Sequence, residues 1–161
     1  MKLLFLLVFL LINSFAYSQN YILPQGEYMD TTRNFNTACE SRYLIYYYQV
    51  NVKYPVSTMT LLAETKEFLI KKKKKYDGNG YITLRFSVDC EGEIHYVKVL
   101  QVDENYQNYH FGKGFVSDLN DYVHTLNKWP QNVSAYELKN VNYIAYISFK
   151  IKNGEVINIV H

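Results

Sequence analysis

The chain contains two cysteines, Cys39 and Cys90, and their wide separation limits the chemistry open to them. Zinc sites take cysteine ligands at close spacing, so this pair does not predict one. In an oxidising compartment the two could form a disulfide that closes a long loop, typically worth about 2–4 kcal/mol. The alternative is two separate buried thiols, which is how free cysteine usually behaves.

The other reactive residue types show no spacing that indicates a metal, nucleotide or acyl-transfer site. No His-Glu-x-x-His motif or acid-rich calcium loop is present, and Gly112–Gly114 lacks the Lys-Ser/Thr of a phosphate loop. There is no Gly-x-Ser-x-Gly elbow. The four histidines, which have no metal-site spacing, are His95, His110, His124 and His161. We therefore expect no metal and no cofactor.

Three acids, Asp89, Glu91 and Glu93, cluster beside a predicted turn. Exposed acids are common at such turns, and a catalytic pair needs a cleft. The sequence therefore predicts no catalytic residues and no enzyme activity. The alternative is a small hydrolase or ligand-binding protein that uses the aromatic loop 103–112 as a lid.

The composition bounds the partners. The chain has 161 residues, a formal net charge of +2, seventeen tyrosines and three prolines. A charge so close to neutral provides no overall field that would gather nucleic acid, so we expect no nucleic-acid partner. The abundance of tyrosine favours strands.

Residues 1–18 are typical of a secretory signal peptide. Lys2 precedes an apolar run from Leu3 to Ile12, and the small residues Ala16 and Ser18 suit cleavage after Ser18. The run is shorter than the roughly 20 residues that span a bilayer, so we expect no stable membrane span after cleavage. The leader predicts an exported protein.

Residues 19–53 form a predicted N-terminal segment that is partly irregular. Within 38–52, the spacing of Leu44, Tyr48 and Val52 predicts a helix, although the composition is rich in strand-forming residues. Tyr54-Pro55 then ends this predicted helix, because the residue before a proline avoids the helical region. Ser57 is a suitable N-cap for a second helix. That helix runs into the lysines Lys71–Lys75, which are either a solvated helix end or a site for anionic headgroups.

Residues 54–161 predict an α+β domain. Two alternating runs meet at "DCEG", Asp89 to Gly92, and two more meet at "KNGE", Lys152 to Glu155, so each pair predicts a hairpin. Between the hairpins, apolar residues recur with helical spacing from Gly114 to Trp129. We expect a small antiparallel sheet of two hairpins with this helix packed on one face.

The order of these motifs resembles the C-terminal domain of TonB. The residues that carry the resemblance are Tyr54-Pro55, "GYITLRFSVDCEGEIHYVKVL" from Gly80, Trp129-Pro130 and "YIAYISFKI" from Tyr143. Together they cover about two-thirds of the expected mature chain. The chain has only three prolines and hence no long Pro-rich spacer, so energy transduction is not expected.

The resemblance implies a non-enzymatic protein located in the periplasm or cell envelope of a Gram-negative bacterium, or secreted from it. It also implies that the protein binds an envelope or outer-membrane protein by adding a strand to a sheet edge. The edge residues it implies are Tyr143, Ile144, Tyr146, Ser148 and Lys150. Further contact candidates are Arg85, on the outer face of the first hairpin, and the loop aromatics Tyr106, Tyr109 and Phe111. The alternative for the aromatics is a place in the core, where most rings of a small tyrosine-rich domain lie.

Overall fold

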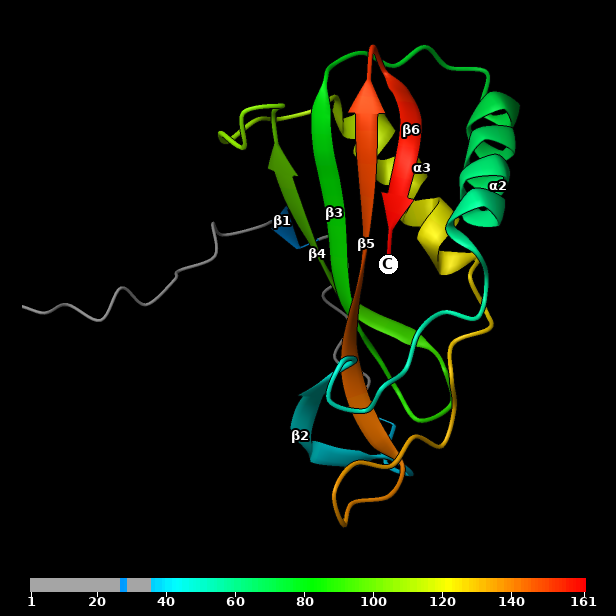
Figure 1. The fold of residues 1–161 in the computed structure, drawn as a ribbon, viewed down its shortest axis with the longest axis vertical. Helices are drawn as coiled ribbons and strands as arrows, with labels where there is room; N and C mark the ends of the chain where they lie inside the picture. Colours follow the sequence, from blue (N-terminus) through cyan, green and yellow to red (C-terminus); the bar gives the residue numbers. More distant parts are fainter. Residues whose placement is uncertain (1–26, 29–35) are drawn as a thin grey trace, which may run out of the picture.

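The structure, a computed structural model, describes residues 27–28 and 36–161 (Figure 1). The predicted leader, residues 1–18, lies outside these ranges. Over the described residues the chain is an α+β fold in which six strands form one sheet accompanied by two helices. The α+β class predicted from the sequence is therefore confirmed.

The sheet has the strand order β1-β4-β3-β5-β2, and β6 also pairs with β5. Its strands are β1 (Glu27–Tyr28), β2 (Glu40–Tyr46), β3 (Gly80–Val88), β4 (Ile94–Val102), β5 (Val141–Lys152) and β6 (Glu155–Val160). β3 pairs antiparallel with both β4 and β5, and β5 pairs antiparallel with β6. β2 runs parallel to β5, so the sheet is mixed rather than wholly antiparallel.

The helix expected within residues 38–52 is wrong, because this stretch forms β2 and a turn. The pairing with β5 is extended beyond the strand by a hydrogen bond from the Tyr47 amide to the Ile144 carbonyl, 2.9 Å long. Tertiary pairing satisfies the backbone here, and the tyrosine-rich composition suits a strand better than a helix.

Both predicted hairpin turns are present. Gly92 has φ +86°, and its amide donates to the Asp89 carbonyl at 3.0 Å, which closes the first turn. Asn153 and Gly154 both have positive φ, at 51° and 75°, as the mirror-image two-residue turn requires. The register of β3 and β4 shifts beside Tyr96, whose φ is 54°, so the return strand contains an irregularity.

The two helices are α2 (Thr58–Lys71) and α3 (Lys113–His124). The Ser57 hydroxyl accepts from the Thr60 amide at 3.1 Å, so the predicted N-cap is confirmed. α3 ends earlier than the apolar spacing predicted. The Thr125 hydroxyl and amide both bond to the Tyr122 carbonyl, at 2.6 and 2.9 Å, and close the last turn.

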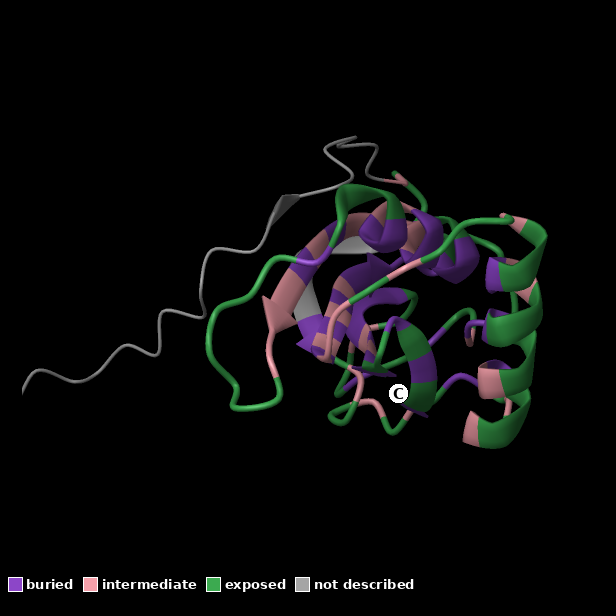
Figure 2. Ribbon diagram, turned by 90° about the horizontal axis from the view of Figure 1, so that it is seen from above, coloured by how far each residue is buried: buried purple, intermediate pink, exposed green. Residues whose placement is uncertain are grey.

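The core lies between the sheet and α3, which sits behind the strands in Figure 1. Alternate residues of β3 face this core and are at most 1% exposed, namely Ile82, Leu84, Phe86 and Val88. Trp129 lies beyond the end of α3 but still packs on Phe86, with ring centroids 5.2 Å apart. Figure 2 shows buried segments gathered around α3 and an outer side of α2 that is largely exposed.

Candidate binding surface

The face of the sheet turned away from α3 carries the second set of alternating residues. Cross-strand pairs Tyr81–Val102, Thr83–Leu100 and Arg85–Lys98 join β3 to β4, and the register with β5 is equally regular. Side chains opposite each other in a ladder lie on one face. We call this surface the open face and define it by Tyr81, Thr83, Arg85, Lys98, Leu100, Val102, Tyr146, Ser148 and Lys150.

Aromatic rings and cations contact each other on the open face. The Arg85 guanidinium lies 5.5 Å from the centroid of the Tyr46 ring and donates to its hydroxyl at 3.4 Å. The Lys150 ammonium lies 5.8 Å from the centroid of Tyr81, on which Tyr106 stacks at 5.3 Å. The hydrogen bond with Tyr81 raises the pKa of Tyr106. These contacts hold flat rings and charges at a solvent-exposed surface.

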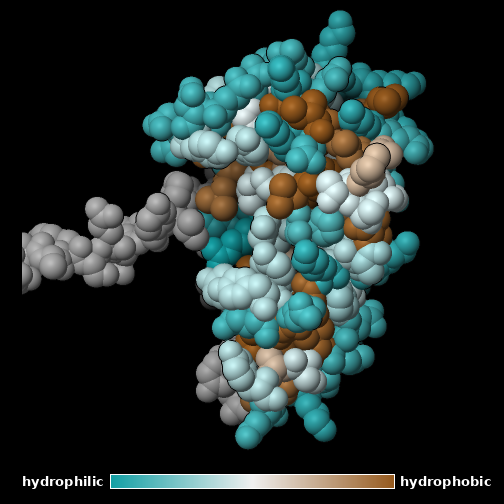
Figure 3. All heavy atoms as spheres, in the orientation of Figure 1, coloured by the Kyte–Doolittle hydropathy of each residue, from teal (hydrophilic) through white to brown (hydrophobic). Residues whose placement is uncertain are grey.

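A shallow hollow of about 500 Å³ lies at one end of the open face, where β3 begins and β5 ends. The hydroxyls of Thr83 and Ser148, 2.7 Å apart, lie on its lining, and Tyr146 and Lys150 also line it. None of the described residues that line it is acidic. Figure 3 views this face, on which pale residues of intermediate hydropathy run between scattered apolar ones. The hollow is open to solvent and suits contact with another molecule better than catalysis.

The strand predicted as a partner-binding edge is not an edge. β5 pairs with β3 along one side, and with β2 at residues 141–144 and β6 at residues 148–152 along the other. Tyr143 belongs to the core, fully buried, and its hydroxyl donates to the Pro130 carbonyl at 3.1 Å. Burial raises the pKa of Tyr143, as does the nearby charge of Asp89. Of the remaining predicted edge residues, Ile144 is 9% exposed, while Tyr146, Ser148 and Lys150 contribute to the open face.

The four secondary contact candidates are divided by the structure. Arg85 and Tyr106 lie at the open face, and Tyr106 is 70% exposed. Tyr109 packs edge-on against Phe111, whose ring is buried beside Phe115. Because Phe111 anchors the loop 103–112 in the core, the end of this loop is part of the fold rather than a free lid.

Serine, histidine and aspartate do meet at the first hairpin, but not as a catalytic triad. The Asp89 carboxylate faces the His95 ring at 3.1 Å and accepts from the amides of Glu91 and Glu93. The Ser87 hydroxyl donates to the backbone carbonyl of His95, 3.0 Å away, rather than to its ring. A catalytic nucleophile needs its base within hydrogen-bond reach, so these three residues do not form a triad. The hydrogen bonds of the cluster stabilise the turn instead.

Two of the five clustered lysines are bound within the fold. Lys74 and Lys72 contact the buried Asp118 carboxylate at 2.7 and 3.3 Å, and the Tyr76 hydroxyl donates to it at 2.9 Å. Burial acts to raise the pKa of Asp118, but the hydrogen bonds from Lys74, Tyr76 and Lys72 outweigh it and hold the pKa below its usual value. Lys72 also pairs with Asp121 at 2.8 Å. These lysines fasten α3 to the chain after α2, so the run is not simply a solvated helix end.

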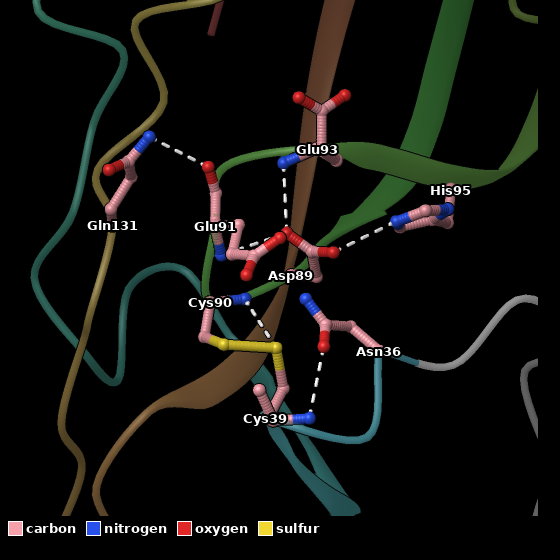
Figure 4. The surroundings of a disulfide bond; sticks show 9 residues. Asn36, Cys39, Asp89, Cys90, Glu91, Glu93, His95 and Gln131 are labelled. Atoms are coloured by element: carbon pink, nitrogen blue, oxygen red, sulfur yellow. Dashed lines mark hydrogen bonds and ion pairs between the residues drawn. A yellow bond between two sulfur atoms is a disulfide. The ribbon is translucent and has the colours of Figure 1, made fainter.

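Cys39 and Cys90 are joined by a disulfide, with Cα atoms 5.5 Å apart (Figure 4). The predicted pairing is therefore confirmed, and the two-thiol alternative is wrong. The bond ties the turn between β3 and β4 to the residue that precedes β2. The Cys90 amide also donates to the Cys39 sulfur at 3.2 Å, and the Gln131 side chain donates to the Glu91 carbonyl at 2.7 Å.

Sequence reasoning did not identify the open face as one surface. It named Arg85, Tyr146, Ser148 and Lys150 for separate reasons, and it assigned no role to Thr83. The signal that could have grouped these residues was the set of polar side chains at alternate positions of two strands. The cross-strand register that brings these side chains together is visible only in the structure.

Among the side chains that the structure describes, no group of three or more potential metal ligands occurs. No helix over residues 27–28 and 36–161 is long and apolar enough to cross a membrane. The chain matches no protein-family model, no curated protein and no solved structure.

Proposed function

We propose that this protein is a non-enzymatic binding module that acts by protein–protein contact in the cell envelope of a Gram-negative bacterium. The observation that carries the proposal is the open face, a sheet surface that no described helix covers and that presents tyrosine rings, hydroxyls and cations together. Tyrosine and arginine are enriched at protein interfaces because they combine contact area with a polar group.

The likeness to the C-terminal domain of TonB is part of this proposal. Support comes from the element order α2-β3-β4-α3-β5-β6, which follows the motif series of that family. Two of the residues that carry the resemblance also meet, since Tyr54 and Trp129 are both buried with ring centroids 4.8 Å apart. Strand addition to β5 is not part of the proposal, because β2 and β6 already pair with that strand.

Site-specific photocrosslinking in intact envelopes tests the proposal. A photoreactive amino acid at Ser148, on the open face, is compared with the same amino acid at Ala63, an exposed position on α2. We expect a discrete adduct with another envelope protein from position 148 and none from position 63. No adduct at position 148, or the same adducts at both positions, would contradict the proposal.

A further inference from the structure

The charges of the open face point to the chemistry of its partner. Resting on the proposed function, we propose that the open face binds an extended, acidic segment of the partner. In this segment two carboxylates stand four residues apart and contact Arg85 and Lys150.

Two cations on this face, Arg85 and Lys150, form no ion pair among the described residues. The cross-strand positions that define the open face include no Asp or Glu. Elsewhere the fold does neutralise cations, since Lys72 and Lys74 are paired with acids of α3. A surface with excess positive charge selects a partner of negative charge.

The geometry of the sheet sets the spacing of the partner's acids. Lys150 lies opposite Tyr81 in the ladder, and Arg85 lies four residues further along β3. At about 3.3 Å per residue the two levels are roughly 13 Å apart. An extended segment lying along the strands has the same rise. Its residues i and i+4 therefore match the two cations, and their even separation keeps both carboxylates on the side facing the sheet.

The surface between the cations suits the residue in the middle of such a segment. The hydroxyls of Thr83 and Ser148 lie at that level and can exchange hydrogen bonds with a bound chain. The rings of Tyr81 and Tyr146 line the same hollow. Binding surfaces that combine rigid tyrosine rings with small hydroxyl residues are typical of protein recognition.

Binding of synthetic nonapeptides to the full chain tests the inference. Three peptides share one background of alternating threonine and valine. The matched peptide carries two aspartates four positions apart, the shifted peptide carries them three positions apart, and the neutral peptide has asparagines in place of the matched pair. By fluorescence anisotropy we expect the matched peptide to bind more than about tenfold more tightly than the neutral peptide, which loses both ion pairs. It should bind about fivefold more tightly than the shifted peptide, which can keep only one of them.

Variants of the protein identify where the peptide binds. Arg85→Gln and Lys150→Gln should each weaken binding of the matched peptide by about fivefold and leave the neutral peptide unchanged. The control Lys66→Gln, which removes an exposed cation of α2, should change neither. Equal binding of the matched and shifted peptides, an equal loss with Lys66→Gln, or no binding of any peptide would overturn the inference. In each of those cases an adduct at Ser148 would still support the proposed function, whereas loss of that adduct would contradict the function itself.

Discussion

The two faces of the sheet are built from the same strands but carry different kinds of residues. On β3, Leu84 is fully buried against the helical side, whereas its neighbour Arg85 contacts a tyrosine ring at the other surface. On β5, Ile147 and Phe149 are buried, whereas Ser148, which lies between them in the sequence, is on the open face. One face is thus closely packed, while the other carries hydroxyls and charged side chains.

The difference separates stability from recognition along one strand. Removing a buried side chain leaves a cavity in a closely packed interior, and this costs several kcal/mol. Removing a side chain at the open face costs little, because water replaces it. Neighbouring substitutions should therefore have very different effects on unfolding.

The largest effect is expected for Leu84→Ala. It should lower the free energy of unfolding by about 2–5 kcal/mol, because Leu84 is fully buried beneath α3. Its neighbour provides the control, since Arg85→Gln should cost less than about 1 kcal/mol. Urea denaturation followed by circular dichroism measures both, and similar losses for the two variants would break the contrast between the faces.

The disulfide should have the next largest effect. Replacing both Cys39 and Cys90 by alanine should lower the free energy of unfolding by about 2–4 kcal/mol, because the bond restricts the unfolded chain. Reduction of the wild-type protein should bring its unfolding midpoint close to that of the double variant. A double variant within about 0.5 kcal/mol of wild type would show that the cross-link does not stabilise the fold.

Asp118→Asn should have an intermediate effect that depends on pH. The pKa of Asp118 is held low in the folded protein, so its contribution is present above the unfolded pKa of about 3.9 and is lost as pH falls through the folded value. We expect a loss of about 1–2 kcal/mol at pH 7 that narrows at pH 3. The control Asp121→Asn removes a half-exposed carboxylate and should cost less.

The smallest effect on stability is expected for Lys150→Gln. Its free energy of unfolding should lie within about 0.5 kcal/mol of wild type, because Lys150 is exposed and forms no ion pair among the described residues. Thermal denaturation at neutral pH checks this. A loss above about 1 kcal/mol would show that the open face also contributes to stability, and would contradict the contrast between the two faces.

Most of the local structure could be predicted from the sequence. Asn153-Gly154 specified its turn because few residue pairs accept positive φ at both positions. The alternation of Ile82, Leu84 and Phe86 identified the buried side of β3, since successive side chains of a strand point to opposite faces. The end of α3 was misjudged because Leu126 and Trp129 are buried without being helical, so apolar spacing alone extended the helix too far.

The tertiary structure decided which strands lie next to each other in the sheet, and this adjacency determines the candidate site. Glu40–Tyr46 resembled a helix locally, yet it pairs in parallel with β5 about a hundred positions later. There it covers residues 141–144 of the strand that the sequence suggested as a partner-binding edge. Non-local pairing leaves no periodic signal within either segment, because its energy comes from backbone groups that every residue shares. The sequence determined which residues of each strand point to the same face. Only the fold determined that the polar residues of neighbouring strands lie side by side and form one surface.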